Sequence, residues 1–458
     1  MSKDSIAAVV LAAGQGTRMK SKLPKVLHPL AGRSMLEQLL ATIDALGPEQ
    51  RLEKRIVVAS PENRDAIDAA IPGLDLAIQD PPLGTGHAMM AAQGQLSGFS
   101  GDALMLFADS PLVSVETLQA MLAARRGKDN PAVVVMGFRP QDTAEYGRLI
   151  VDDHGNLQRI VEHRDASAAE RQTDLCNSGF MAIDGAVLAQ LLDALGNDNA
   201  KGEYYLTDIV EIANQQGRRC AVVEASEIEA HGINSRDQLA QAEAVVQNRL
   251  RHAAMAAGVT LLDPDSVYFS HDSVIGQDVT IQPHVYFGPG VTVADNVTIN
   301  AFSHLEGCTI AAGASIGPFA RLRPEAMIGA DARIGNFVEV KKASIEDGAK
   351  VNHLAYIGDA RVGAGANIGA GTITCNYDGF LKSFTDIGKG AFIGSNSALV
   401  APVKIGDGAI VGAGSTVTRD VAADALAVER SAQKELSDWA LSFRKRKSAE
   451  KAAQKKKS

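Results

Sequence analysis

Short apolar runs alternate with helix-like stretches over the first half of the chain. The runs are mostly apolar, as is typical of strands buried on both faces of a sheet, and they lie at Ile6–Leu11, Arg55–Ala59, Ala103–Ala108 and Ala132–Gly137. Helix-like stretches such as Ser34–Leu46 and Val115–Ala124 lie between them. The alternation predicts an α/β domain with a Rossmann-like, mostly parallel sheet.

A different pattern begins at Val274, where an aliphatic residue recurs every six positions and is usually followed by a small residue. Sustained from Ile275 to Val417, this period predicts a parallel β-helix. Three repeats complete one triangular coil, and the aliphatic side chain points into it. The loop from Thr374 to Asp386 interrupts the repeat. The pattern resembles that of known left-handed β-helices, which are an exception to the right-handed rule for crossover connections.

These two patterns predict a division into three parts. Residues 1–236 form the α/β domain and residues 237–257 a linker helix, because Ser235 to about Met255 is rich in Ala, Gln, Glu and Leu, with Gly258 after its end. Residues 258–458 form the β-helix and a C-terminal tail. The basic tail from Arg444 to Lys457 is expected to be a solvated terminus rather than a nucleic-acid patch.

Composition narrows the class of protein. A formal net charge of −9 argues against nucleic acid as the main partner. The four Cys form no C-x-x-C pair, so neither a zinc site nor a disulfide framework is indicated, and a reducing compartment is expected. The apolar run Ile6–Ala13 is too short to span a membrane. We therefore expect a cytoplasmic protein without membrane insertion.

Candidate phosphate chemistry lies near the N-terminus. The first predicted strand runs into a Gly-rich turn at Gly14–Gly16, and such a turn lets backbone N–H groups approach phosphates. Arg18 and Lys25 can neutralise the charge of a phosphate under attack. The turn matches neither the full dinucleotide fingerprint nor a Walker A loop, so by itself it is equally explained as a tight turn.

Two oxygen-bearing side chains are candidate metal ligands, each with a structural alternative. Asp109 ends a buried run, and Mg²⁺ prefers hard oxygen ligands that it shares with substrate phosphates. Its alternative role is a helix or turn cap. Asn234 precedes the predicted linker helix, where Asn is also a common N-cap.

The whole stretch Leu11–Met19, with Lys25 after it, resembles the signature of the sugar-nucleotide pyrophosphorylases. The resemblance implies in-line attack by a sugar 1-phosphate on the α-phosphate of UTP, with Mg²⁺ present and pyrophosphate released. It implies that Gln79 reads the uracil edge, that Gly147, Glu162 and Asn177 contact N-acetylglucosamine, and that Asp109 and Asn234 hold the metal. The complete implied set is Leu11, Ala12, Ala13, Gly14, Arg18, Lys25, Gln79, Gly84, Thr85, Phe107, Ala108, Asp109, Gly147, Glu162, Asn177 and Asn234. The family usually has Gly at the position of Ala108 and often Tyr at that of Phe107.

Polar residues break the β-helix pattern around His353. Acyl transfer from a thioester to an amine needs a base, and imidazole titrates in the right range, although a lone His is more often structural. The segment Arg321–Tyr377 resembles the glucosamine-1-phosphate acetyltransferase half of the bacterial bifunctional N-acetylglucosamine-1-phosphate uridyltransferases. The motifs that carry this resemblance are Ala320–Pro324, Asn336–Lys342 and Asn367–Gly379.

This resemblance implies roles for a second set of residues. His353 is the general base. Arg323 and Lys341 bind the sugar phosphate, Tyr356 and Asn367 bind the sugar, and Lys382 is a further candidate for the phosphate. Acetyl-CoA is contacted by Ala370, Asn376, Tyr377, Ser395, Ala413 and Arg430. For Arg323 and Lys341 the alternative is a solvated charged surface, and for Asn376–Tyr377 it is a turn. Because the β-helical acyltransferases resemble one another in being trimers, we expect a homotrimer with active sites between neighbouring prisms.

Three functional hypotheses remain distinct. In the first, the chain is a bifunctional enzyme that acetylates glucosamine 1-phosphate and then makes UDP-N-acetylglucosamine, a precursor of peptidoglycan and lipopolysaccharide. In the second, it is a nucleotidyltransferase whose β-helix serves only regulation or oligomerisation. In the third, it is a non-catalytic binding scaffold, which tolerates substitution of Lys25, Asp109 and His353.

Overall fold

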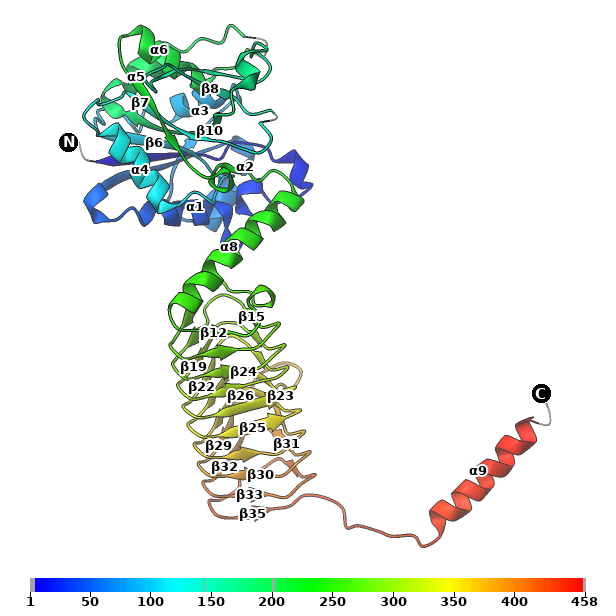
Figure 1. Cartoon of the computed structure of the whole chain (residues 1–458). Helices are drawn as coiled ribbons and strands as arrows, with labels where there is room; N and C mark the ends of the chain where they lie inside the picture. The colour runs from blue at the N-terminus through cyan, green and yellow to red at the C-terminus, as the bar shows by residue number, and fades with distance from the viewer. Residues whose placement is uncertain (1–4, 144, 200–201, 456–458) are drawn as a thin grey trace. The chain divides into compact units, whose positions relative to one another are not determined.

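The computed structural model describes residues 5–143, 145–199 and 202–455, which form two compact units (Figure 1). The N-terminal unit comprises Met1–Ala253 with Phe269–His271, and the C-terminal unit comprises Ala254–Tyr268 with Asp272–Ser458. The expected linker helix, 237–257, overlaps α8 (Arg236–Ala256), and the division between the units falls near the end of this helix. Among the described residues, no helix is both long and apolar enough to cross a bilayer.

A mixed sheet forms the centre of the N-terminal unit, with the main order β11-β7-β10-β6-β1-β4-β5. Its strands are β1 (Ile6–Leu11), β4 (Leu52–Ala59), β5 (Asp75–Ile78), β6 (Asp102–Phe107), β7 (Val133–Phe138), β8 (Arg148–Val151), β9 (Leu157–Val161), β10 (Cys176–Asp184) and β11 (Cys220–Glu224). Its helices are α1 (Met35–Asp44), α2 (Pro61–Ala70), α3 (Thr85–Ala91), α4 (Val115–Arg125), α5 (Gly185–Asp193), α6 (Ile209–Gln215) and α7 (Glu227–Ala230). A small hairpin, β2 (Pro29–Leu30) and β3 (Arg33–Ser34), precedes α1.

Apolar side chains project from both faces of this sheet into the core, as the apolar runs predict. Along β1, Ala7 and Val9 enter the core that α3, α5 and α6 cover, whereas Ala8 and Val10 enter the core that α1, α2 and α4 cover. Helix α1 starts at Met35 because Ser34 and Glu37 form a reciprocal capping box.

The sheet is less parallel than the apolar runs suggest. Strand β10 runs antiparallel to both β6 and β7. Parallel neighbours need a long crossover, usually a helix, whereas the segment between β7 and β10 carries the antiparallel pair β8 and β9. The segment Asn177–Gly179, which is polar or small and only partly buried, hides this strand from a search for apolar runs.

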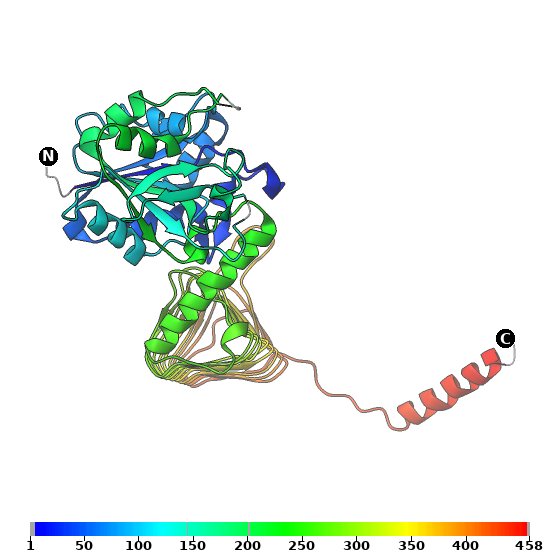
Figure 2. The same cartoon turned by 45° about the horizontal axis from the view of Figure 1, so that its top comes forward.

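The C-terminal unit is a parallel β-helix whose coils superpose in a triangular outline (Figure 2). One sheet contains β12 (Thr260–Leu261), β14 (Thr280–Ile281), β17 (Thr298–Ile299), β20 (Ser315–Ile316), β23 (Arg333–Asn336), β25 (Lys350–His353), β27 (Asn367–Ile368), β30 (Phe392–Ile393), β33 (Ile410–Val411) and β35 (Leu426–Ala427). The other strands are β13 (Val274–Ile275), β15 (Tyr286–Phe287), β16 (Thr292–Val293), β18 (His304–Leu305), β19 (Cys308–Ile310), β21 (Arg321–Leu322), β22 (Ala326–Ile328), β24 (Glu339–Ile345), β26 (Tyr356–Val362), β28 (Ile373–Cys375), β29 (Thr385–Ile387), β31 (Ala398–Val400), β32 (Val403–Ile405) and β34 (Thr416–Val417).

The repeat in the sequence corresponds to the stacking of the coils in the β-helix. Ile281, Ile299, Ile316 and Ile334 occupy successive strands of one sheet, and all four are buried. The expected interruption from Thr374 to Asp386 is too wide. Thr374 lies inside β28, is buried, and pairs with Leu399, because its hydroxyl is satisfied by the carbonyl oxygen of Gly358. The loop that interrupts the coils therefore lies between β28 and β29.

Aromatic rings stack along one corner of the β-helix. The rings of Phe302, Phe319 and Phe337 lie one coil apart, with centroid separations of 4.9 and 5.1 Å. Leu354 follows them one coil later, where its amide bonds to the carbonyl of Asn336. These four side chains are 45–61% exposed within the single chain. We call them the aromatic corner.

The last described element is helix α9 (Trp439–Lys455). It contains most of the expected basic tail, including Arg444 and Lys451. Lys456 and Lys457 lie outside the described residues.

Candidate active sites

The N-terminal unit has a pocket of about 640 Å³ at the carboxyl ends of β1 and β6. Strand β1 lies between β6 and β4, and the chain passes first to β4 and later to β6. Ligands of open α/β sheets bind at such switch points. The structure brings eleven of the expected residues into the lining, namely Leu11, Ala12, Ala13, Gly14, Lys25, Gln79, Gly84, Thr85, Phe107, Asp109 and Glu162.

The Gly-rich turn closes tightly over the stem of Lys25. Gly16 has a φ of +60°, and a Cβ placed there would lie 2.5 Å from the Cβ of Lys25. Both the backbone conformation and the close approach therefore require glycine. Arg18, in contrast, is exposed on this turn and is not among the residues that line the pocket.

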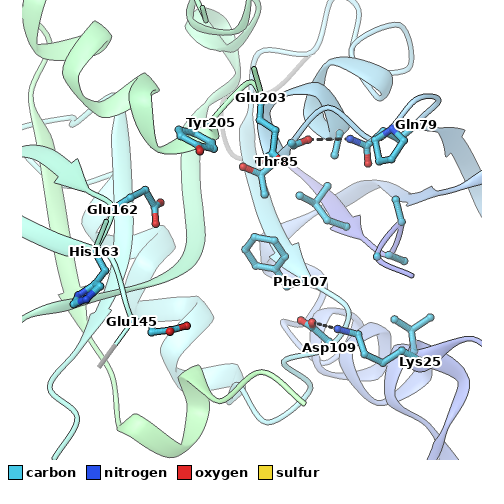
Figure 3. A pocket seen from close by; sticks show the side chains of 18 of the residues that line it. Lys25, Gln79, Thr85, Phe107, Asp109, Glu145, Glu162, His163, Glu203 and Tyr205 are labelled. Atoms are coloured by element: carbon cyan, nitrogen blue, oxygen red, sulfur yellow. Dashed lines mark hydrogen bonds and ion pairs between the residues drawn. The ribbon is translucent and has the colours of Figure 1, made fainter. Parts of the chain in front are cut away.

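Lys25 joins the two expected metal ligands. Its Nζ donates to Asp109 Oδ2 at 2.5 Å and to Asn234 Oδ1 at 2.9 Å. Lys25 is only 8% exposed, so this charge depends on those oxygens for its solvation. The Asp109 carboxylate and the Asn234 amide oxygen thus both contact the ammonium of Lys25. Figure 3 shows the Lys25–Asp109 pair.

The helix cap at the start of α8 belongs to Ser235 and not to Asn234. Ser235 Oγ accepts from the amide of Gln238, and Gln238 Oε1 accepts from the amide of Ser235. This reciprocal pair satisfies the helix start, which leaves the side chain of Asn234 free to face Lys25. The amide nitrogen of that side chain donates to Gly232 O, so its oxygen points toward the cation.

The segment that follows Gln79, the expected reader of the uracil edge, is held from two sides. Gln79, which is buried, donates through Nε2 to Gly84 O at 2.9 Å. Thr85 Oγ1 accepts from the amide of Leu206, and the amide of Gly86 donates to Tyr204 O. The segment that makes these bonds also brings Glu203 and Tyr205 into the pocket, two residues that the sequence did not single out.

The three residues expected to contact the sugar lie in or beside β8, β9 and β10. The amide of Asn177 donates to Gly147 O at 2.8 Å, and Asn177 Oδ1 accepts from the amide of Gly179 at 2.9 Å. Glu162 faces Phe107 across the pocket (Figure 3). Gly147 and Asn177 adjoin this wall without lining the pocket, whereas Glu145, which was missed in the sequence, lines it.

Phe107 and Ala108 depart from the usual residues of the resembled family, and the structure separates their surroundings. The ring of Phe107 lies in the middle of the pocket (Figure 3). The side chain of Ala108 is fully buried in the core on the α1 side. The methyl group of Ala108 is thus accommodated by the core and does not enter the pocket.

Gly179 gives Phe107 its position. A Cβ at Gly179 would lie 2.3 Å from Phe107 Cε2, and the φ of Gly179 is +91°. We expect Gly179→Ala to lower the free energy of unfolding by about 1–3 kcal/mol more than Gly155→Ala does, because the ring must shift within a packed wall. Gly155 is a matched control, since its φ is +80° but nothing lies within 4 Å of its added Cβ. Urea unfolding of the whole chain, followed by circular dichroism, measures both; equal losses would show that the ring moves freely.

In the C-terminal unit, the tautomer of His353 is set by Asn336. His353 Nδ1 lies 2.6 Å from Asn336 Oδ1. An amide oxygen only accepts, so Nδ1 carries the proton and Nε2 keeps a lone pair. His353 is exposed at the corner where β25 ends, beside the aromatic corner. Asn336 received no role in the sequence analysis, although it lies within a quoted motif.

Three expected phosphate ligands form one cationic cluster. The neighbouring ammonium of Lys382 and the guanidinium of Arg323 lower the pKa of Lys341. A bound anion would relieve the repulsion among these three positive charges, which is the arrangement expected of a phosphate site. Arg323 also donates to Glu339 Oε1 at 2.8 Å, which fixes the guanidinium over β24. Tyr356 lies on the next strand, paired with Glu339, whereas Asn367 lies in β27 of another sheet.

The expected acetyl-CoA contacts lie at two different corners of the prism. Ala370, Ser395 and Ala413 follow His353 along one corner, where the amide of Asn396 donates to Ala370 O and that of Gly414 to Ser395 O. Arg430 Nη1 reaches Ala413 O at 2.5 Å and extends this row. Asn376 and Tyr377 instead follow β28, and Asn376 Nδ2 donates to Asp359 Oδ2 at 2.5 Å. The length of β28 separates these two groups within one chain.

Two family descriptions match the chain. A MobA-like NTP transferase domain matches residues 8–169, and a bacterial transferase hexapeptide of six repeats matches residues 272–307 and 384–419. The first match contains most of the N-terminal pocket. The second lies within the β-helix and brackets the coils that carry His353.

Proteins named bifunctional protein GlmU are similar to the chain over nearly its full length. The protein of Paramagnetospirillum magneticum is 58% identical over 452 residues, which cover 99% of both chains. That of Sphingopyxis alaskensis is 56% identical over 453 residues, again 99% of both. That of Rhodospirillum rubrum is 58% identical over 438 residues, which are 96% of this chain and 97% of the relative.

Proposed function

Because the chain belongs to the family of bifunctional GlmU proteins, we propose that its two clusters of polar residues are the two active sites of UDP-N-acetylglucosamine synthesis. The β-helix acetylates glucosamine 1-phosphate with acetyl-CoA, and the N-terminal pocket transfers UMP from UTP to the product. The observation that carries this proposal is the end-to-end match to relatives named bifunctional. A non-catalytic β-helix or a binding scaffold does not account for that match.

The N-terminal pocket supports in-line transfer without a covalent enzyme intermediate. The Gly-rich turn binds phosphates through its amides, and Lys25 lies where it can neutralise the phosphate under attack. Gln79 and the Gly84–Thr85 turn hold the base, while Glu162, Gly147 and Asn177 orient the sugar. The phosphate oxygen of N-acetylglucosamine 1-phosphate attacks the α-phosphorus of UTP, and the bond to pyrophosphate breaks.

A magnesium ion fits the Asp109 and Asn234 oxygens. Both are hard oxygen donors, and they already converge on a cation, Lys25 Nζ. Mg²⁺ is usually held by one or two carboxylates together with substrate phosphates, so two protein oxygens are enough for such a site. The part of the chain that is described has no cluster of three or more His, Cys, Asp or Glu side chains suited to a metal. When bound, the ion supplies charge neutralisation for the phosphates.

The C-terminal cluster supports acyl transfer. Arg323, Lys341 and Lys382 hold the phosphate of glucosamine 1-phosphate, and His353 Nε2 accepts a proton from the amine as its nitrogen attacks the thioester carbonyl. The carbon–sulfur bond breaks and free coenzyme A leaves as the thiol. Asn336 is a positioning residue, because it acts only through the tautomer of His353.

The position of the acetyl-CoA residues supports a homotrimer. Because Ala370, Ser395 and Ala413 lie at a different corner from Asn376 and Tyr377, one complete site needs corners from neighbouring prisms. The aromatic corner continues into Leu354, beside His353, so the exposed apolar row and the proposed base share one edge. An exposed apolar row of this kind marks an interface. A cytoplasmic location remains part of the same proposal.

A charge in the aromatic corner is expected to break the trimer. Phe319→Asp should convert the trimer to monomers in static light scattering, because the carboxylate is desolvated between stacked rings. Met327→Asp is the matched control, since Met327 is 56% exposed, against 45% for Phe319, but lies in β22, away from that corner. A parent chain that is monomeric under the conditions of the assay contradicts the proposed assembly.

A split assay on the whole chain tests the proposed function. One arm contains glucosamine 1-phosphate and acetyl-CoA and measures free thiol; the other contains N-acetylglucosamine 1-phosphate, UTP and Mg²⁺ and measures pyrophosphate. We expect product in both arms. Pyrophosphate without thiol would make the β-helix a scaffold, and the absence of both products would remove the enzymatic proposal.

A further inference from the structure

Lys25 occupies the point on which the proposed metal ligands converge. Its ammonium lies within hydrogen-bond distance of both Asp109 Oδ2, at 2.5 Å, and Asn234 Oδ1, at 2.9 Å. The lysine comes from the turn after the Gly-rich loop, whereas its two partners are 84 and 209 residues away along the chain. The fold therefore brings two oxygen donors together, and the ammonium of Lys25 occupies the position between them.

A divalent ion cannot share these oxygens with the ammonium. Mg²⁺ binds oxygen at about 2.0–2.1 Å, and Nζ lies only 2.5 and 2.9 Å from the same two oxygens, so an ion held by both would lie within a few ångströms of the ammonium. Two positive charges at that separation repel strongly even in a polar environment. Metal binding at Asp109 and Asn234 therefore requires the ammonium to leave.

Lys25 has a place to which it can move. Its backbone is fixed in a short 3₁₀ helix, Lys25–Leu27, and its Cβ is held under Gly16, but the rest of the stem is a flexible chain of methylenes. Lys25 lines the same pocket as Ala13 and Gly14 of the phosphate-binding turn. A nucleotide phosphate bound at that turn attracts the ammonium away from Asp109.

We propose that Lys25 is an internal competitor of the divalent cation, which keeps the affinity of the empty pocket for metal low until a nucleotide phosphate draws the ammonium away. Metal and nucleotide are then positively coupled, because each favours the position of Lys25 that the other needs. The same movement carries the lysine to the phosphate that it neutralises. This inference rests on the proposed function only in taking Asp109 and Asn234 as the metal ligands.

The test measures binding of Mn²⁺ alone, without nucleotide, through the electron paramagnetic resonance signal of the free ion. We expect Lys25→Met to bind Mn²⁺ about tenfold more tightly than the parent chain. Lys25→Arg keeps a cation between the two oxygens and should retain the weak affinity of the parent. Thermal unfolding of each variant shows whether the chain remains folded.

Two controls separate the possible results. Arg18→Met removes a positive charge from the Gly-rich turn that precedes Lys25, and no described hydrogen bond joins Arg18 to Asp109, so this variant reports the general effect of charge on metal affinity. If Lys25→Met binds Mn²⁺ no more tightly than Arg18→Met, the competition does not exist. Asp109→Asn should bind Mn²⁺ more weakly than the parent, because the site loses its negative charge; if it binds Mn²⁺ like the parent, the proposed metal site is wrong, which is a different failure. If Lys25→Met does not fold although Lys25→Arg does, Lys25→Gln replaces it, and its affinity for Mn²⁺ is compared with that of Arg18→Met in the same way.

Discussion

Replacement of His353 by alanine is expected to lower kcat for acetyl transfer by about 10²–10⁴-fold, the usual contribution of a general base. The imidazole is exposed and makes its described hydrogen bond only to Asn336, so its removal leaves no cavity in the prism core. The fold of the β-helix should therefore be unchanged. The measurement is the release of free thiol from acetyl-CoA at saturating glucosamine 1-phosphate, together with pyrophosphate release in the other arm.

His304→Ala is the matched control for this variant. His304 is also an exposed histidine of the β-helix, but it stacks on Tyr286 and has no amide partner in the described contacts. It should keep acetyl transfer at the parental rate. If His353→Ala loses less than tenfold, another group removes the proton from the amine. If it loses pyrophosphate release as well, the two sites are not independent.

Replacement of Asp109 by asparagine is expected to lower kcat/KM for uridylyl transfer by about 10²–10³-fold. Asparagine keeps an oxygen that can accept from Lys25 but removes the negative charge that a divalent ion needs. Asparagine is the better test than alanine, because alanine would leave the ammonium of Lys25, which is 8% exposed, with one partner fewer and could cost stability. Pyrophosphate release at several Mg²⁺ concentrations measures the effect.

Higher Mg²⁺ should restore part of the lost rate, since the variant weakens the site without removing both donors. Asp68→Asn on the exposed face of α2 is the control and should leave both activities unchanged. A variant Asp109→Asn that retains the parental rate at low Mg²⁺ would exclude Asp109 as a metal ligand. Retention of acetyl transfer shows that any loss is confined to the N-terminal site.

The periodic parts of the chain were predictable from its sequence. Burial at Ile281 and Ile299, which are 18 residues apart, follows from the six-residue spacing, and β1 follows from its apolar run. Predictions from the sequence were wrong or missing where the periodicity of apolar residues is weak. Strand β10 has polar or small residues near its start, and Thr374 occupies an inward position although it is not aliphatic, because its hydroxyl is bonded inside the coil.

The candidate sites show the same contrast at the level of single residues. The local turn around Gly14 and the motif around His353 were recognisable because their chemistry lies within a few consecutive positions. The role of Asn234 was not decided by its sequence, since a helix start explains it equally well. The tertiary structure resolved the cap in favour of Ser235, through its reciprocal bonds with Gln238.

The sequence by itself determined the two kinds of architecture, the family and the identity of the reactive groups, because these depend on short-range patterns of side chains. Only the tertiary structure decided which groups meet: Lys25 with Asp109 and Asn234, His353 with Asn336, and Arg323 with Glu339. These partners are separated by 16 to 209 residues, and their contact follows from strand order and coil register rather than from local preference. The competition proposed for Lys25 arises at that level, where distant oxygens converge on one cation.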